Sequence, residues 1–432
     1  MSKRLIVVLA LVFVVGLTFA AYAEVQNVKV SGDLNFLAIG RDNFDLGVGT
    51  PNLNKGRLFG TQARIRIDAD LTDNVMTTIR LINERNWGNN TTANTNAKID
   101  LDLAYVTLKE FLYSPLSVTV GRQEMRFGNA LIIGNGNLLT NGAADLFGFP
   151  RDLSLRKAFD GIKAVLNYDP LVVDLIYAKV SNVNTNTSDS DNLFGVNVSY
   201  DVNKKLNVNP YVFVKEDKSA VGNAAGIDKK RNSVVTTGAL ISGSPIENLN
   251  TSLEGAVQFG NNRNTAVAKK HGGFALQGLA DYTFAKVKYT PMLGAGYTYL
   301  SGNNKKAGWD AMFTDQRLNS ITYAILPFTN MQVVNIKGSA KPIDDVTLMA
   351  NYGFYRLNKA VTTITNAYTS TAMNMNTSKK DLGSALDLTA LYDYTEDVQI
   401  GLTYGVFWKG TAFVGSKGDS ATQLIGSMKV TF

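Results

Sequence analysis

The 432-residue sequence has no cysteine and a single histidine, and only 18% of its residues are charged. The lack of cysteine excludes a disulfide scaffold, a thiol nucleophile and a thiolate metal site. His271 is the one imidazole that a catalytic mechanism would have, and no serine lies in a recognisable nucleophile motif, so we do not expect an enzyme. After residue 23 the chain has no long apolar run. If the protein spans a membrane, it must therefore do so with strands.

The N-terminus has the pattern of an export signal. Lys3 and Arg4 precede an apolar segment that runs from Leu5 to Phe19, and Ala21-Tyr22-Ala23 is a small-x-small cleavage site. We predict that residues 1–23 are a signal peptide cleaved before Glu24, and that residues 24–432 form a single domain; a retained anchor is the alternative. Cleavage lowers the formal net charge from +7 to +5, an excess too small and too dispersed for a nucleic-acid partner.

The last ten residues have one apolar and one mostly polar face, as a strand requires. The apolar face consists of Leu424, Gly426, Met428, Val430 and Phe432. An edge strand of a soluble β domain would hide this face under a second layer, whereas a membrane barrel turns it toward lipid and pairs the strand with the first one. An alternating strand that ends in Phe432 also resembles the signal recognised by the outer-membrane barrel assembly machinery, which is an expected partner.

Eighteen segments have the alternation and length of tilted membrane-spanning strands. They cover residues 27–39, 59–70, 74–85, 97–109, 115–124, 156–168, 170–181, 190–201, 205–216, 231–243, 247–260, 272–284, 286–301, 328–340, 343–357, 381–394, 397–409 and 421–432. Their connections alternate between short and long along the whole chain, with Ala285 and Lys341-Pro342 among the short ones. This pattern predicts an all-β fold, a transmembrane antiparallel up-and-down β-barrel of about 18 strands, with short periplasmic turns and long extracellular loops.

Such a barrel is integral to the outer membrane of a Gram-negative-type bacterium and contacts outer-membrane lipid. Aromatic residues beside the short turns fit a girdle at the periplasmic interface. They are Tyr168, Tyr200, Tyr282, Phe284, Tyr289, Tyr392, Tyr394 and Phe432.

Eighteen strands leave an aqueous channel, so function depends on the charged side chains that face inward. By alternation the basic candidates for the pore lining are Arg64, Arg66, Arg80, Lys163, Lys215, Lys288, Arg356, Lys409 and Lys429. The acidic candidates are Asp68, Glu84, Asp100, Asp102, Asp174, Glu254, Asp281 and Asp387. Arg64, Arg66 and Arg80 lie on neighbouring strands near Asp100 and Asp102, and opposed charges of this kind either set a selective field or pair to stiffen a wet wall.

The longest connection, residues 125–155, contains many apolar residues, among them Met125, Leu138, Leu139 and Phe147. An exposed loop seldom carries so many. We predict that this loop folds into the channel and narrows it.

Two stretches resemble the alginate-export family of outer-membrane barrels. They are Leu81-Ile82-Asn83-Glu84-Arg85-Asn86-Trp87-Gly88 and Val120-Gly121-Arg122-Gln123-Glu124-Met125-Arg126-Phe127-Gly128. Leu382-Gly383-Ser384-Ala385-Leu386-Asp387-Leu388 is similar to that family's penultimate hairpin. The resemblance implies an eighteen-stranded porin with an arginine-rich constriction for anionic polysaccharide, and it adds Arg122 to the pore-lining candidates.

We therefore expect a porin that passes small or linear hydrophilic solutes, with anionic oligosaccharides as a candidate class. The alternatives are a plugged structural or adhesive barrel whose surface loops bind a ligand, and a soluble β-rich carbohydrate binder. No cofactor is expected. Two acidic stretches, Asp42-Asn43-Phe44-Asp45 and Asp189-Ser190-Asp191-Asn192, have hard oxygen ligands for Ca²⁺ without the full ligand spacing, so solvated loops are the default.

Overall fold

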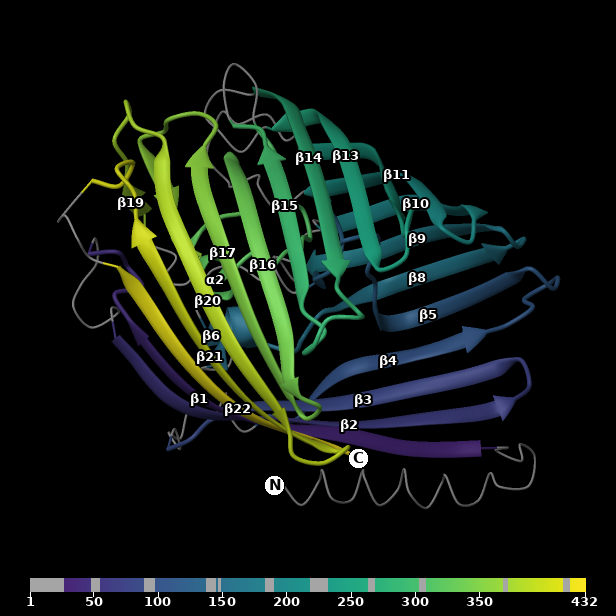
Figure 1. Cartoon of the computed structure of the whole chain (residues 1–432). Coiled ribbons are helices and arrows are strands. Elements are labelled where there is room, and N and C mark those ends of the chain that lie inside the picture. The colour runs from purple at the N-terminus through teal and green to yellow at the C-terminus, as the bar shows by residue number, and fades with distance from the viewer. Residues whose placement is uncertain are drawn as a thin grey trace.

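The computed structural model shows a β-barrel (Figure 1). It describes residues 27–47, 55–88, 98–136, 145–146, 149–182, 190–217, 232–262, 269–302, 308–367, 372–414 and 420–432. The predicted signal peptide and Asp189 lie outside these ranges. No helix within them is long and apolar enough to cross a membrane.

Over the described residues one antiparallel sheet contains eighteen strands. These are β1 (Asn27–Asp42), β2 (Lys55–Thr72), β3 (Val75–Asn86), β4 (Asp100–Leu108), β5 (Leu116–Glu124), β8 (Ala158–Asn167), β9 (Leu171–Asn182), β10 (Ser190–Asn203), β11 (Leu206–Asp217), β12 (Asn232–Gly243), β13 (Leu249–Asn262), β14 (Lys269–Thr283), β15 (Met292–Leu300), β16 (Met331–Ile343), β17 (Val346–Leu357), β20 (Asp381–Asp393), β21 (Val398–Lys409) and β22 (Ala421–Thr431). The long connections contain short elements: β6 (Asp145–Leu146), β7 (Phe149–Pro150), the 3₁₀ turn η2 (Arg151–Leu153), α2 (Ser320–Ile325), β18 (Thr363–Thr365) and β19 (Ala372–Asn374).

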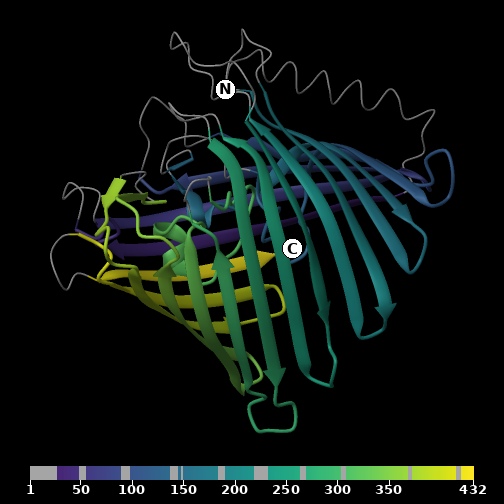
Figure 2. The same ribbon diagram turned by 90° about the horizontal axis from the view of Figure 1, so that it is seen from above.

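The sheet closes on itself, because β1 pairs with β2 on one side and with β22 on the other. The purple β1 and the yellow β22 lie side by side in both ribbon views (Figures 1 and 2). Closure leaves no edge strand with unpaired backbone groups, which is what a sheet in lipid requires. Each of the eighteen predicted segments overlaps a different strand of the sheet, so the predicted fold class is confirmed.

The two faces of the strands also follow the predicted alternation. On β2, Ile65 and Ile67 are exposed on the outer surface, whereas Arg64 and Arg66 make polar contacts inside. On the last strand Leu424 and Met428 are exposed outside, and Ile425 is buried inside. The eight aromatic residues predicted for the periplasmic girdle are all exposed and lie beside the short turns.

Two short turns differ from the prediction. Residues 284–291 connect β14 to β15, although their alternation of apolar and basic residues had suggested that the strand resumed after Ala285. Local hydrogen bonds hold this turn instead, with the Phe284 N–H donating to the Pro291 oxygen at 2.8 Å. The next turn consists of Asp344 and Asp345 rather than Lys341-Pro342, because the pairing of β16 with β17 shifts at Pro342, a residue that has no backbone N–H to donate.

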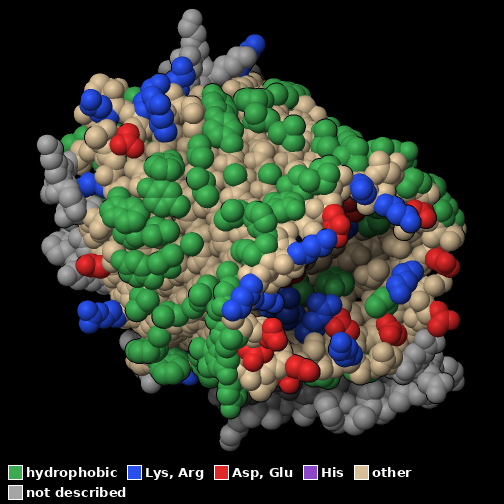
Figure 3. All heavy atoms as spheres, viewed as in Figure 1, with side chains coloured by type: hydrophobic (Ala, Val, Ile, Leu, Met, Phe, Trp, Pro, Cys, Tyr) green, Lys and Arg blue, Asp and Glu red, His purple; other side chains and the backbone are tan. Residues whose placement is uncertain are grey.

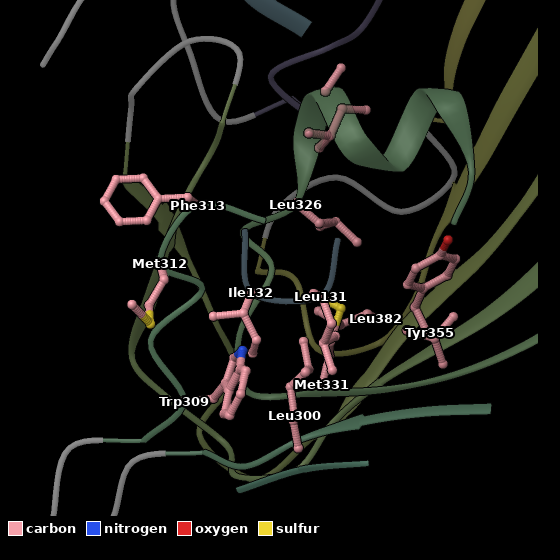
Figure 4. Close-up of a cluster of buried hydrophobic side chains, with 14 of the residues drawn as sticks. Leu131, Ile132, Leu300, Trp309, Met312, Phe313, Leu326, Met331, Tyr355 and Leu382 are labelled. Atoms are coloured by element: carbon pink, nitrogen blue, oxygen red, sulfur yellow. The ribbon is translucent and has the colours of Figure 1, made fainter. Parts of the chain in front are cut away.

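A hydrophobic core lies within the barrel, on the inner face of the strands (Figure 4). Trp309, Met312 and Phe313 come from the connection between β15 and β16 and pack with Leu131 and Ile132 from the connection between β5 and β8. Strand residues complete the cluster, including Leu300, Met331, Tyr355 and Leu382. An ordinary membrane barrel has a polar interior, so this core means that segments of the chain fill part of the bore.

Candidate functional site

Two long connections meet inside the barrel, the β5–β8 loop (residues 125–157) and the β15–β16 loop (residues 301–330). The Phe313 N–H donates to the Ile132 oxygen and the Asp315 N–H donates to the Ala130 oxygen, each at 3.0 Å. The rings of Phe159 and Phe313 pack edge to face, with centroids 5.5 Å apart. The prediction that the loop at 125–155 folds inward is confirmed for its described residues. Its effect on conductance stays a prediction.

The β15–β16 loop is fixed to one wall of the barrel by a charged anchor. Lys215 on β11 donates to both carboxylate oxygens of Asp310, at 2.7 and 2.8 Å. Gln258 on β13 accepts a hydrogen bond from the Asp310 N–H at 2.8 Å and donates to the Asp310 backbone oxygen at 2.9 Å. Burial alone would raise the pKa of Asp310, but Lys215 and the Met312 N–H hold that pKa below its ordinary value.

The far end of the same loop is fixed to a different wall. Asp387 on β20 accepts from the Ser320 N–H at 2.6 Å, at the start of α2, and from the Asn319 amide at 3.1 Å. Asn319 in turn accepts from the Tyr355 hydroxyl on β17 at 2.8 Å. Gln423 on β22 donates to the Ser320 hydroxyl at 3.0 Å. The loop therefore crosses the bore from β11 and β13 to β20 and β22.

The end of the β5–β8 loop is anchored to the first strands of the barrel. Arg41 on β1 makes a two-bond ion pair with Asp152, at 2.5 and 3.1 Å. Glu84 on β3 accepts from the Arg156 side chain at 3.2 Å, and Arg156 also contacts Asp100 at 2.5 Å. These side chains are mostly buried, so each charge depends on its partner. Together the two loops form a partition held at several points of the wall.

A basic cluster lies where the two loops meet. Arg126 and Lys157 from the β5–β8 loop and Arg317 from the β15–β16 loop all approach the carboxylate of Asp315; we call these four residues the Asp315 cluster. The Arg126 Nη1–Asp315 Oδ2 distance is 3.3 Å, the Arg317 Nε–Asp315 Oδ1 distance is 3.8 Å, and Lys157 contacts Oδ2. Tyr323 on α2 donates to Oδ1 at 3.4 Å and lies under the Arg317 guanidinium, 5.0 Å from ring centroid to Cζ. Three cations thus share one carboxylate.

Two cations of this cluster face open space. The side chains of Arg126 and Arg317 are 54% and 43% exposed, although both belong to inward-folded loops, while Asp315 is only 9% exposed. Part of each side chain is therefore open to solvent. Burial lowers the pKa of Lys157, the neighbouring Arg317 lowers it further, and the contact with Asp315 opposes both effects. Burial also raises the pKa of Tyr323 to about 12, so this phenol stays neutral.

The charged ladder predicted on β2, β3 and β4 is present on the inner wall, and its members are paired. Arg64 bonds Asp33 on β1 at 2.9 Å, and Arg66 bonds Asp68 at 2.7 Å. Arg80 bonds Asp102 at 2.6 Å and also contacts Glu124. This pairing favours the interpretation that these charges stiffen a wet wall, because a paired ladder produces little net field.

Several of the pore-lining candidates face the interior. They are Arg64, Arg66, Arg80, Asp100, Asp102, Lys163 and Lys409. Lys163 lies 3.4 Å from Asp174 and over the ring of Phe127, and Lys409 donates to the Leu46 oxygen at 3.2 Å. Their role in transport stays a prediction.

The assignment of Arg122 to the pore lining is wrong. The exposed Val120 precedes Arg122 by two residues on β5, and the ladder pairs Val120 with the exposed Ile162 and Arg122 with Asp160 on β8. Arg122 donates to the exposed carboxylate of Asp160 at 3.0 Å on this outer face. The motif does supply an arginine to the interior, but it is Arg126, which lies beyond the end of the strand where alternation no longer applies.

Arg356 and Lys288 are also misplaced by the prediction. Tyr355 and Leu357 are buried inside, so the intervening Arg356 side chain lies on the outer face, where it is exposed. Lys288 lies in the turn at residues 284–291, with its Nζ 4.7 Å from the centroid of the Tyr289 ring. It was assigned to a strand only because β15 was predicted to begin six residues too early.

The predicted Ca²⁺ loops gain no support from the described residues, which contain no group of three or more acidic or histidine side chains arranged to hold a metal ion. Asp45 is buried and accepts a hydrogen bond from the Gly47 N–H at 3.0 Å.

A space-filling view shows the bore as a hollow with basic and acidic side chains inside it, surrounded by an apolar outer surface (Figure 3). The fold and this charged interior define an outer-membrane porin. The protein is integral to the outer membrane and conducts small hydrophilic solutes through its bore. The chain belongs to the alginate-export family, whose model matches residues 41–427.

Solved structures of proteins from Pseudomonas aeruginosa share the fold at low sequence identity. OccK11 (OpdR) has a TM-score of 0.59 at 11% identity, covering 95% of this chain and 98% of that one. OccK8 (OprE) has a TM-score of 0.57 at 11% identity, over 95% and 100% of the two chains. OccK2 (OpdF), solved in complex with glucuronate, has a TM-score of 0.57 at 10% identity, over 94% and 99%. No curated protein matches the chain significantly.

The sequence did not reveal the Asp315 cluster. Arg126 lies within the quoted family motif, but Lys157, Asp315 and Arg317 lie in connections where alternation gives no direction for a side chain. A signal for the second loop was present, because Trp309, Phe313 and the apolar residues around Ile325 make residues 301–330 more apolar than an exposed loop usually is.

Proposed function

We propose that this porin selects anionic, saccharide-like solutes, and that Arg126, Lys157 and Arg317 carry the selectivity. The observation that supports the proposal is the excess of positive charge where the two inner loops meet, three cations to one carboxylate. At an effective dielectric constant of about 20, a carboxylate about 5 Å from one cation gains roughly 3 kcal/mol. Such an interaction is large enough to raise the local concentration of an anion.

Two further observations favour a sugar acid over a small inorganic anion. The chain belongs to the alginate-export family, and the fold relative OccK2 (OpdF) was solved with glucuronate.

Reversal potentials in planar bilayers under a salt gradient test the proposal. The Arg126→Ala/Arg317→Ala variant should lose most of the wild-type preference for anions. The matched control is Arg356→Ala, which removes an arginine from the outer face and should leave the reversal potential unchanged. An equal reversal potential in wild type and double variant would exclude the cluster as the selective element.

We infer further that Phe432 serves as the signal for barrel assembly. Its side chain is 62% exposed at the outer face, and its backbone exchanges hydrogen bonds with Gly32 at 2.8 and 3.0 Å, so it is both accessible and fixed at the closing seam. Phe432→Ala should lower the amount of folded protein in the outer membrane. The matched control is Tyr394→Ala, which removes another exposed aromatic side chain at the same end of the barrel. A separate prediction, cleavage of the signal peptide before Glu24, is tested by N-terminal sequencing of the mature protein.

We propose that the porin has no catalytic activity and needs no cofactor. His271 is buried, with its Nε2 3.1 Å from the Gln258 side-chain oxygen, an arrangement that fixes the loop anchor rather than activating a nucleophile. Hydrolysis of ester, peptide or oligosaccharide substrates by purified protein, lost in His271→Ala, would contradict this.

A further inference from the structure

The carboxylate of Asp315 occupies the position that an anionic solute would seek. Among the described residues, Arg126 and Lys157 approach Oδ2, and Arg317 and the Tyr323 hydroxyl approach Oδ1. A solute carboxylate in the bore therefore meets cations that are already engaged by an acid of the protein itself.

The backbone holds this acid in place. The Asp315 N–H donates to the Ala130 oxygen at 3.0 Å, which ties it to the β5–β8 loop. Two residues earlier, Phe313 is fully buried against Ile132 and Phe159. Asp315 consequently cannot move away with a passing solute, whereas the side chains of Arg126 and Arg317 are about half exposed to solvent.

We propose that Asp315 is a resident counter-anion that competes with anionic solutes for Arg126, Lys157 and Arg317, and so keeps their binding weak enough for release. The proposal rests on the proposed function, because it concerns the same cluster. A channel conducts only if its sites bind a solute firmly enough to admit it and weakly enough to let it leave. Three cations without a resident acid would retain a multivalent sugar acid, and the fixed negative charge shortens its stay.

A purely structural role for Asp315 makes a different prediction. If the acid only holds the two loops together, its removal loosens the partition and affects neutral and acidic sugars alike. If it competes with the solute, its removal affects acidic sugars alone. The charge of the probe therefore separates the two roles.

The test uses single channels of the mature protein in planar bilayers, with trigalacturonate as the acidic blocker and maltotriose as the neutral one. Asp315→Asn keeps the shape of the side chain and an acceptor oxygen while removing its charge. We expect the residence time of trigalacturonate to rise about tenfold, a change of about 1.4 kcal/mol, with that of maltotriose unchanged. Asp315→Glu, which keeps the charge, should behave as wild type.

An unchanged or shorter residence of trigalacturonate in Asp315→Asn would overturn the proposal, and so would an equal rise for both sugars. The variant leaves the half-buried Lys157 without its acid, which is a risk to folding. A comparison of Lys157→Gln with Lys157→Gln/Asp315→Asn avoids an unpaired buried lysine. The residence time of trigalacturonate should be longer in the double variant than in the single one. If Arg126→Ala/Arg317→Ala abolishes anion preference while Asp315→Asn changes nothing, only this inference fails. If the arginine variant also changes nothing, the proposed function fails.

Discussion

Removal of the Lys215–Asp310 ion pair should release the β15–β16 loop from the wall of the barrel. Asp310→Asn retains a hydrogen-bonding side chain but leaves Lys215, which is 12% exposed, without its carboxylate. Exposed ion pairs contribute up to about 1 kcal/mol, whereas breaking a buried pair costs about 3–5 kcal/mol. For this half-buried pair we expect a cost of about 2 kcal/mol. Because about 1.4 kcal/mol corresponds to a factor of ten, the population of detached loop should rise about 30-fold.

Single-channel recording measures this population directly, because the conductance changes transiently when the loop detaches from the wall. The wild-type channel should be quiet, and Asp310→Asn should flicker. The matched control is Asp281→Asn, which breaks an ion pair of similar length, 2.9 Å to Lys337, that joins β14 to β16 and involves no loop. A quiet Asp310→Asn channel would refute the reasoning, and so would equal flicker in Asp281→Asn, which would indicate general loosening of the barrel.

Four other predictions follow from the same contacts. The pKa of Asp310 is held below its ordinary value of 3.8, so its anchor is fully present above that range and is lost only as pH falls through the depressed pKa; wild-type flicker should therefore begin only below about pH 4 in recordings at stepped pH. Burial and Arg317 lower the pKa of Lys157 from 10.5, so on raising the pH the anion preference should begin to fall before a free lysine titrates, and Lys157→Arg should abolish this early decline in reversal-potential measurements. Phe313→Ala empties a fully buried site and should destabilise the inner loops by about 3–5 kcal/mol, seen as faster proteolysis between residues 301 and 330 while the barrel stays heat-modifiable on gels. Because Arg64 is paired with Asp33, the joint variant Arg64→Gln/Asp33→Asn should leave the reversal potential unchanged, and a large shift would restore the field interpretation of the ladder.

The outer wall of this barrel could be predicted from the sequence because lipid imposes a simple rule on each strand. Every second residue of a strand, such as Ile65 and Ile67 on β2, must be apolar, and short turns must alternate with long loops. These two patterns located all eighteen strands. The rule failed where it was weak. The turn at residues 284–291 alternates by chance, and Arg356 lies outward near the end of its strand, where the outer face is no longer restricted to apolar residues. Arg122 was assigned to the pore by the family resemblance, whereas alternation with Val120 places it outward, as the structure does.

The interior was less predictable, because its side chains contact residues that are far away in the sequence. Arg126 meets Asp315 across 189 positions, and Lys215 meets Asp310 across 95. Apolar composition showed that residues 125–155 fold inward, yet no local pattern specified which loop they would meet. From the sequence, Arg64 and Arg80 could either set a selective field or pair with acidic side chains. Only the register of the first strands showed that they are paired.

The block of the wild-type channel by charged and neutral trisaccharides of equal size measures the selectivity of the bore most directly. Trigalacturonate added to one side should interrupt the ion current at concentrations at least tenfold lower than maltotriose, and Arg126→Ala/Arg317→Ala should remove that difference. Equal block of the wild-type channel by both sugars would mean that the charges where the two loops meet do not select the solute.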